Sequence, residues 1–510
     1  MSRLVPSVVL SLALLAVAGC DTSRAAVEPD PDFDPATVDY NEVTSLDYDE
    51  YVRPLLVARN AFASAATDAR GDDAAYAYDA LLDSEWGATI IPFDGAASLL
   101  VRLAREPLAE GVTNPYPNLQ TLEPDELDYL RRWIEDGARG PDGAPGYADA
   151  RHLLYVCNQL AGRVAIVDAD RMRTIRLVHF EDLGEPADAK PHHVVAEPDG
   201  SAWYVALIAG TDGGSVLKLS GSLATDPASG GYVLARETPP AGSGTFEKPG
   251  MLALDTARSR LYAGRSFSAS STSNGIAQFT DLGTLSFDEI STPPVHPHAV
   301  GVSPDGRYLF TAALEPTGAN TEAYVYDTDT DDLVQRLPVP GRLAFVQYAV
   351  SPDGGTVVLT EQTGGGLALF DVAGGRLALR TTVPTGEQPW HPSFSPDGRT
   401  VYVPNRVSNT VSFVDVASGA VARTVANPDG GALPLSQPHG SAVSDDGRTL
   451  FVSNRNLMMS GDALYEPPVR FAGEPMDLQS NVVAIDTASG EIVAVIPQGR
   501  WASGLAYVAL

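Results

Sequence analysis

The sequence predicts a mainly β protein, a seven-bladed β-propeller that follows a small all-α domain. Three observations support this fold class: a recurring corner motif, strand patterns between the corners, and an unpaired strand at the end of the chain. Ser-Pro-Asp-Gly or a close variant begins at residues 197, 303, 351, 395 and 444. A repeat of roughly 40 to 50 residues that combines strands and turns is typical of propeller blades. The long first interval predicts a further, altered copy near Asp255.

Each blade should contain four antiparallel strands joined by tight turns. The clearest example has strands near residues 392–395, 400–403, 410–415 and 420–425. The same pattern predicts six complete strand groups, near residues 192–236, 249–290, 297–337, 346–381, 391–425 and 438–496. Strands near 153–156, 164–168 and 174–178 lack an inner strand, and a last strand near 504–508 would complete their blade and close the ring.

Composition excludes some functions. The formal net charge is -31 and the chain contains three lysines, which excludes nonspecific binding to nucleic acid. The length fits one large closed domain, which we place at residues 141–510, with smaller segments before it. We expect a monomer.

The N-terminus has the pattern of an export signal. Residues 1–19 contain a basic start and an apolar run that is too short for a lasting membrane span. The ending Val17-Ala18-Gly19-Cys20 resembles the lipobox of bacterial lipoproteins, which implies lipidation of Cys20 and a linker over residues 20–48. The alternative is a plain secretory signal. We therefore expect an exported protein of the bacterial cell envelope, held on the periplasmic or surface side of a membrane by its lipid anchor.

Residues 49–140 have helical rather than strand patterns. One helix should begin near Asp49, and another should begin near Glu123 and bury Trp133 and Ile134. The order of pieces and the ending at 133–138 resemble small cytochrome c domains. Where such domains have a CxxCH haem motif, residues 60–65 contain no cysteine and no histidine, so we expect no covalent haem. An unrelated helical spacer is the alternative.

The second and third strands of the blades carry a family resemblance. Tyr155-Val156-Cys157-Asn158, Tyr402-Val403-Pro404-Asn405 and Phe451-Val452-Ser453-Asn454 are similar to the signature of the YVTN-type propellers. The strands that follow them, at 163–168, 410–415 and 481–486, also resemble that family. The resemblance covers roughly residues 150 to 510 and implies a fold rather than an activity.

Five of the eight histidines lie at equivalent positions just before or within inner strands, at one mouth of the predicted channel. Imidazole is a good ligand for Cu, Zn and Fe. The functional hypothesis is a metal site formed by His193, His298, His391 and His439, with His192 and Met251 nearby. Nitrous oxide reductase and the haem-d nitrite reductase, which have similar propellers, hold copper or haem in this way. The alternative is structural, since such histidines can bond to backbone or to an adjacent blade.

A long insertion in the last blade, residues 455–479, contains Met458, Met459 and Met476 and is expected to border the same face. No catalytic constellation is recognisable, so we assign no catalytic residue and expect that the protein is not an enzyme. The leading hypothesis is a scaffold that binds an envelope protein or a small ligand through its histidine-bearing face. The alternative is an electron-transfer protein that binds haem or a metal such as copper.

Overall fold

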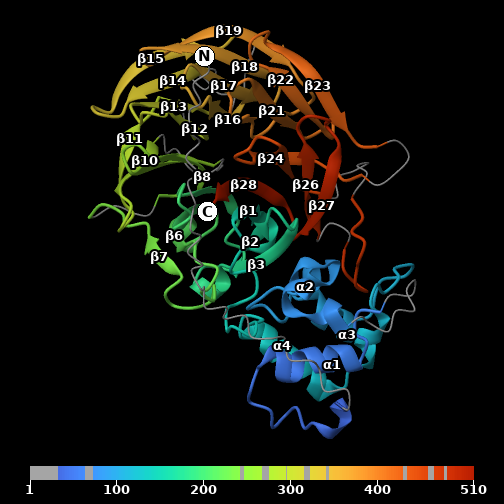
Figure 1. Cartoon of the computed structure of the whole chain (residues 1–510). Coiled ribbons are helices and arrows are strands. Elements are labelled where there is room, and N and C mark those ends of the chain that lie inside the picture. The colour runs from blue at the N-terminus through green and yellow to red at the C-terminus, as the bar shows by residue number, and fades with distance from the viewer. Residues whose placement is uncertain are drawn as a thin grey trace, which may run out of the picture.

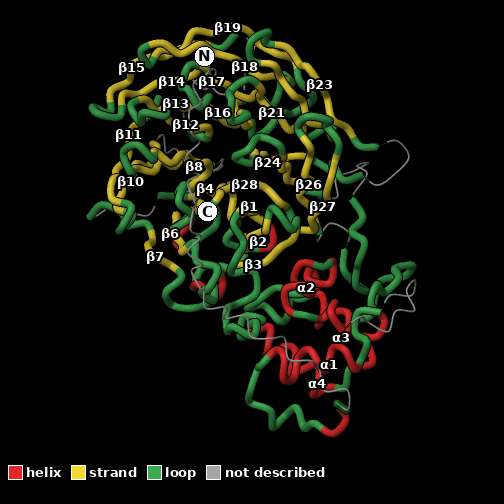
Figure 2. The backbone as a smooth tube through the Cα atoms, in the orientation of Figure 1, coloured by secondary structure: helices red, strands yellow, loops and turns green. Residues whose placement is uncertain are grey.

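The computed structural model describes most of the chain, which forms a ring of β-sheets and a separate group of short helices (Figure 1). Figure 2 shows the strands gathered in the ring and the larger helices gathered beside it. The described residues are 33–63, 73–241, 246–266, 275–293, 296–314, 322–340, 344–428, 433–457, 465–475 and 479–510.

The ring contains seven antiparallel sheets of four strands each, which confirms the predicted seven-bladed propeller. The first four blades are formed by β28 (Ala502–Ala509), β1 (His152–Asn158), β2 (Arg163–Asp168) and β3 (Arg173–His179); β4 (Pro191–Ala196), β5 (Ala202–Leu207), β6 (Ser215–Ser220) and β7 (Val233–Arg236); β8 (Pro249–Asp255), β9 (Arg260–Arg265), β10 (Gly275–Asp281) and β11 (Ser286–Ser291); and β12 (Ala299–Val302), β13 (Tyr308–Ala312), β14 (Glu322–Asp327) and β15 (Asp332–Pro338).

The other three blades follow the same order from the centre of the ring to its rim. They are formed by β16 (Phe345–Val350), β17 (Thr356–Glu361), β18 (Gly366–Ala373) and β19 (Arg376–Pro384); β20 (Ser393–Phe394), β21 (Thr400–Asn405), β22 (Thr410–Asp415) and β23 (Ala420–Ala426); and β24 (Pro438–Val443), β25 (Thr449–Asn454), β26 (Ser480–Asp486) and β27 (Ile492–Gln498).

The last strand closes the ring, as the strand count predicts. β28 is the inner strand of the first blade and pairs with β1, with Tyr155 opposite Ala506 and Leu153 opposite Val508. This pairing leaves no open edge between the first and last blades. It also joins the two ends of the propeller chain, so the blades hold one another in place.

The recurring corners have a shared hydrogen-bond pattern. The Ser303 hydroxyl donates to the Asp305 carboxylate at 2.6 Å and accepts from the Tyr308 amide at 2.9 Å. Ser351, Ser395 and Ser444 repeat both bonds. The glycine that ends each corner has a φ of 67° to 72°, in the left-handed region that favours glycine. The motif therefore recurs because its serine, aspartate and glycine each satisfy a part of the same turn.

The N-terminal domain contains four short α-helices, α1 (Arg53–Ala58), α2 (Tyr78–Asp83), α3 (Leu99–Arg105) and α4 (Pro124–Glu135), with 3-10 turns between them. α4 begins with a capping box between Glu123 and Glu126 and buries Trp133 and Ile134, as its sequence predicts. An aromatic group fills part of the core, where the Phe62 and Trp86 rings stack at 5.3 Å. A cytochrome c-like domain is not shown by this arrangement and remains a prediction. Among the described residues, none of the helices could cross a bilayer.

The insertion of the last blade begins beside the histidines, where Arg455 bonds to His439, and its later part lies at the helical domain. Its described part extends from the propeller to the helical domain, where Phe471 joins the helical core and lies 3.8 Å below the Arg102 guanidinium (Figure 1). Glu474 forms an ion pair with Arg102 at 2.7 Å. The insertion therefore fastens the helical domain to the propeller. Met458, Met459 and Met476 lie outside the described residues, as does Cys20.

Candidate functional site in the central channel

The structure brings five histidines together at one end of the central channel. His192 and His439 lie in the inner strands β4 and β24, and the other members precede or lie in inner strands of their blades. The imidazole centroids of His391 and His439 are 4.4 Å apart. The imidazole centroid of His192 lies 5.6 Å from that of His298, 6.1 Å from that of His391 and 6.2 Å from that of His439. His193 lies 5.7 Å from His391 by the same measure. We call His192, His193, His298, His391 and His439 the histidine cluster.

A repeated backbone feature positions this cluster. In six blades a residue other than glycine has a φ between 51° and 62° just before the inner strand, namely Lys190, Lys248, His296, Gln388, Gln437 and Trp501. Such left-handed residues are uncommon and tend to occur at functional sites. The following residue is proline in five of the six, so the chain leaves each left-handed residue with its next φ fixed. The inner strands therefore start in the same way, and their histidines converge.

The inner strands are partly exposed next to the cluster. His193 is partly exposed, and so are Val195, Ser393 and Ser441 farther along the inner strands, whereas the remaining members of the cluster are buried.

The imidazoles of the cluster are neutral at physiological pH. Burial lowers the pKa of His193 to about 3 and that of His298 to about 4. Burial, reinforced by neighbouring charged groups, also places the pKa of His192, His391 and His439 well below its usual value. Each ring therefore offers one N–H donor and one lone pair.

An arginine and two tryptophans extend the cluster. The Arg455 guanidinium lies 4.6 Å from the Trp390 ring centroid and 4.3 Å from that of Trp501, and its Nη2 donates to His439 Nε2 at 2.7 Å. Trp390 also stacks on His439 with centroids 4.4 Å apart. We call Arg455, Trp390, Trp501 and His439 the donor group.

The donor group has buried N–H groups without an acceptor. These are Arg455 Nε, Trp390 Nε1, Trp501 Nε1 and His439 Nδ1. Burial and the nearby Arg406 place the pKa of Arg455 well below its usual value, and no described carboxylate offsets that effect. Since a guanidinium stays charged in proteins, this pKa direction reflects an unfavourable buried charge. Buried polar groups normally find partners, so this place lacks an acceptor.

The sequence pattern could have identified Arg455 as a residue of the site, although the resemblance to YVTN-type propellers does not. The second strands of the sixth and seventh blades end at Asn405 and Asn454, and an arginine directly follows each of them, so Arg406 and Arg455 occupy one register position. Trp390 likewise occupies the position that His192 and its counterparts hold in other blades, one residue after a proline. The register of the repeat could therefore have placed both side chains at the channel mouth.

The four histidines of the predicted metal site lie together, but Met251 does not lie with them. His193, His298, His391 and His439 belong to one cluster with His192, whereas Met251 lies in an apolar core between blades. Within the described residues, no three His, Cys, Asp or Glu side chains are arranged to hold a metal ion. A metal at this cluster remains a prediction.

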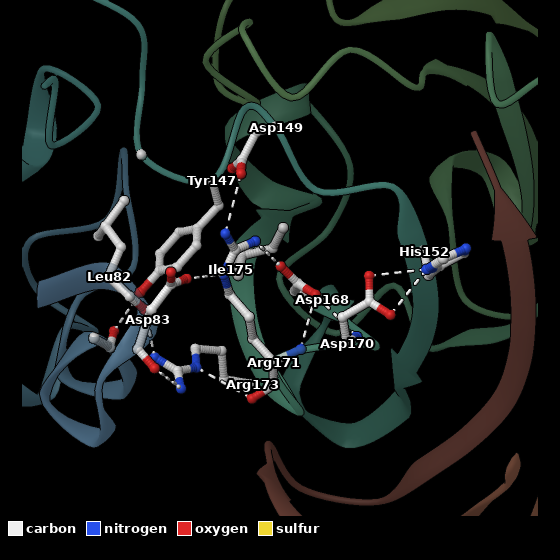
Figure 3. Close-up of polar contacts among 12 residues, drawn as sticks. Leu82, Asp83, Tyr147, Asp149, His152, Asp168, Asp170, Arg171, Arg173 and Ile175 are labelled. Carbon is white, nitrogen blue, oxygen red and sulfur yellow. Dashed lines mark hydrogen bonds and ion pairs between the residues drawn. The ribbon is translucent and has the colours of Figure 1, made fainter. Parts of the chain in front are cut away.

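A second candidate lies between the helical domain and the first blade. It is a cleft of about 890 Å³ whose lining includes Tyr78, Asp83 and Arg171. Arg171 bonds to Asp83, Asp149 and Asp168 at 2.7 to 3.0 Å (Figure 3). The central charge of this cleft is therefore satisfied internally, in contrast to Arg455. We take the channel as the better candidate site.

The comparisons with known proteins agree on fold. A model of the family "Lactonase, 7-bladed beta-propeller" matches residues 342–433. The structure of a putative 6-phosphogluconolactonase from Bacteroides fragilis is 16% identical, with a TM-score of 0.51 over 71% of this chain and 99% of that one. The Pseudomonas aeruginosa periplasmic gluconolactonase is 20% identical, with a TM-score of 0.50 over 70% of this chain and 99% of that one.

Hydrazine synthase from Kuenenia stuttgartiensis is 17% identical, with a TM-score of 0.46 over 62% of this chain and 91% of that one. No curated protein matches the chain. The chain is thus a seven-bladed propeller that resembles lactonase propellers over residues 342–433, and an activity does not follow from this likeness.

Proposed function

We propose that this protein is a lipid-anchored envelope propeller that binds a small anion at the donor group of its central channel. One observation carries the proposal: the Arg455 guanidinium, which pairs with no described carboxylate, contacts Trp390, Trp501 and His439, and all four side chains have a buried N–H without an acceptor. Carboxylates and other oxyanions accept several such bonds at once and neutralise the charge. An anion therefore supplies what the donor group lacks.

Charge favours an anion over a cation here. Arg455 would repel a cation in contact with the donor group, and its buried position makes that repulsion stronger than in water. The whole chain carries a formal charge of -31, which repels anions at long range. Binding must therefore come from short-range contacts inside the channel, and it should depend weakly on salt because buried charges are poorly screened.

Calorimetry with a panel of anions tests the proposal. Acetate, succinate, phosphate and gluconate would be titrated into the protein and into Arg455→Gln, which keeps polar atoms but loses the charge. We expect at least one anion to bind and the variant to lose about 100-fold or more in affinity, as for a broken buried ion pair. Arg448→Gln is the matched control, because that side chain is 84% exposed. Equal losses in both variants, or no binding by any anion, would exclude an anion site at Arg455.

Lactone hydrolysis is a second candidate function. Two of the similar structures are titled a putative 6-phosphogluconolactonase and a periplasmic gluconolactonase. Opening a lactone produces a carboxylate that the donor group would accept. In this chain both ring nitrogens of His391 lack a partner, so its neutral imidazole could take a proton from water. Hydrolysis of glucono-lactone by the protein, and its loss in His391→Phe, would support this function. Equal rates in both proteins would exclude it.

A further inference from the structure

The hydrogen bonds of the histidine cluster determine which nitrogen of each ring carries the proton. His298 Nδ1 lies 2.7 Å from the Val346 carbonyl oxygen, which can only accept, so the Nε2 lone pair is free. His192 Nδ1 faces the Gln159 side-chain oxygen at 3.3 Å, which leaves Nε2 as an acceptor without a partner. Both rings are neutral, as argued above. His192 and His298 therefore present lone pairs.

The other side of the cluster has the opposite polarity. His439 Nε2 accepts from Arg455, so its proton is on Nδ1. His193 Nδ1 accepts from the Leu252 amide at 3.2 Å, so its proton is on Nε2. The cluster thus has acceptors at His192 and His298 and donors at His439, Arg455 and the tryptophans. By ring centroids, His192 lies 5.6 Å from His298 and 6.2 Å from His439, so the acceptor side and the donor side of the cluster are adjacent.

We infer that the anion is a small hydroxy acid, whose carboxylate meets the donor group and whose hydroxyl donates to the buried lone pair of His192 Nε2. This inference rests on the proposed anion site. A hydroxyl is the uncharged donor that satisfies a buried lone pair without bringing a second charge beside Arg455. A metal ion would also use lone pairs, but the described residues place no three such ligands around one point. The short span between the rings favours acids with a few carbon atoms.

Matched pairs of acids test the inference. Lactate and propionate, malate and succinate, and citrate and tricarballylate differ only by one hydroxyl. We expect the hydroxy acid of at least one pair to bind ten-fold or more tightly, because its partner leaves a buried lone pair unsatisfied. His192→Phe removes that lone pair, so this preference should fall toward one while the affinity for the plain carboxylate changes little.

His193→Phe on the same strand is the control, since His193 contributes no free lone pair and the preference should persist. Circular dichroism melting would verify that both variants fold. Equal affinities within every pair would overturn the inference while leaving the anion site intact. A preference that disappears after chelation, with Zn²⁺ or Cu²⁺ found in the untreated protein, would also overturn it in favour of a metal. If no acid binds at all, the result excludes the proposed anion site, and with it the preference for hydroxy acids.

Discussion

Replacing Arg455 by methionine should have little effect on the stability of the ligand-free protein, although Arg455 is buried. The change removes one hydrogen bond to His439 and two contacts with tryptophan rings. At about 1 kcal/mol for the bond and about 2 kcal/mol for each desolvated cation–π contact, the loss is about 5 kcal/mol. Burial of an uncompensated charge costs several kcal/mol, which the variant recovers. We expect the two amounts to cancel to within about 1 kcal/mol.

Arg265 provides the matched control. It is also buried and ends the second strand of its blade, whereas Arg455 directly follows one. Unlike Arg455, it donates to the Gly275 and Glu247 carbonyl oxygens and pairs with Glu289. Arg265→Met leaves these acceptors without their donor, so we expect a loss of about 3 to 5 kcal/mol.

Urea unfolding followed by tryptophan fluorescence would measure both variants, after a check that refolding is complete. The ligand-induced rise in the urea midpoint should disappear in Arg455→Met and persist in Arg265→Met. A loss of stability in Arg455→Met as large as that in Arg265→Met would refute the reasoning. Arg455 would then be a structural residue whose charge is compensated.

Three further predictions concern pH, the insertion and the anchor. Because the folded pKa of His298, about 4, lies below its usual value, its contribution to stability is complete above pH 6.5 and is lost as the pH falls toward 4. The free energy of unfolding, measured with urea from pH 7.5 to 4.5, should therefore fall less steeply in His298→Gln, by up to about 1.4 kcal/mol per pH unit. Parallel slopes for the two proteins would contradict this. Phe471→Ala should cost about 3 to 5 kcal/mol of docking and speed amide exchange in the helical domain, whereas Glu474→Gln should cost less than about 1 kcal/mol. Equal exchange in the two would exclude the fastening role. Cys20→Ala should release the protein from membranes and abolish palmitate labelling, whereas Cys157→Ala should not; an unchanged membrane fraction would exclude the anchor.

The sequence allowed the fold to be predicted in detail because each copy of the repeat forms the same turn with the same hydrogen bonds. The corners form the same bonds in each blade, so their spacing gave the boundaries of the blades. It also showed that the first blade needs an inner strand from elsewhere in the chain. The course of the insertion could not be predicted in this way. Phe471 docks in the helical core through contacts across more than 300 residues of chain, and no local pattern encodes such a pairing.

The site was predictable to the extent that it follows the repeat. Positions in register placed all five histidines correctly at one mouth of the channel. Register could also have placed Arg455 and Trp390, but it does not reveal their contacts with each other and with His439, which join different blades. The charge state of the cluster also depends on burial, which periodicity does not reveal.

The members of the histidine cluster differ in their hydrogen bonds. His298 bonds to the Val346 carbonyl and His193 to the Leu252 amide, both in the adjacent blade, as a purely structural role requires. His391 has no partner at either nitrogen. A repeat that used histidine only to join blades would satisfy every ring, because an unsatisfied buried imidazole costs stability that a leucine or phenylalanine would not. The bonds of His193 and His298 instead fix two rings, and the ligand that we propose would satisfy the unpartnered atoms of His391 and the donor group.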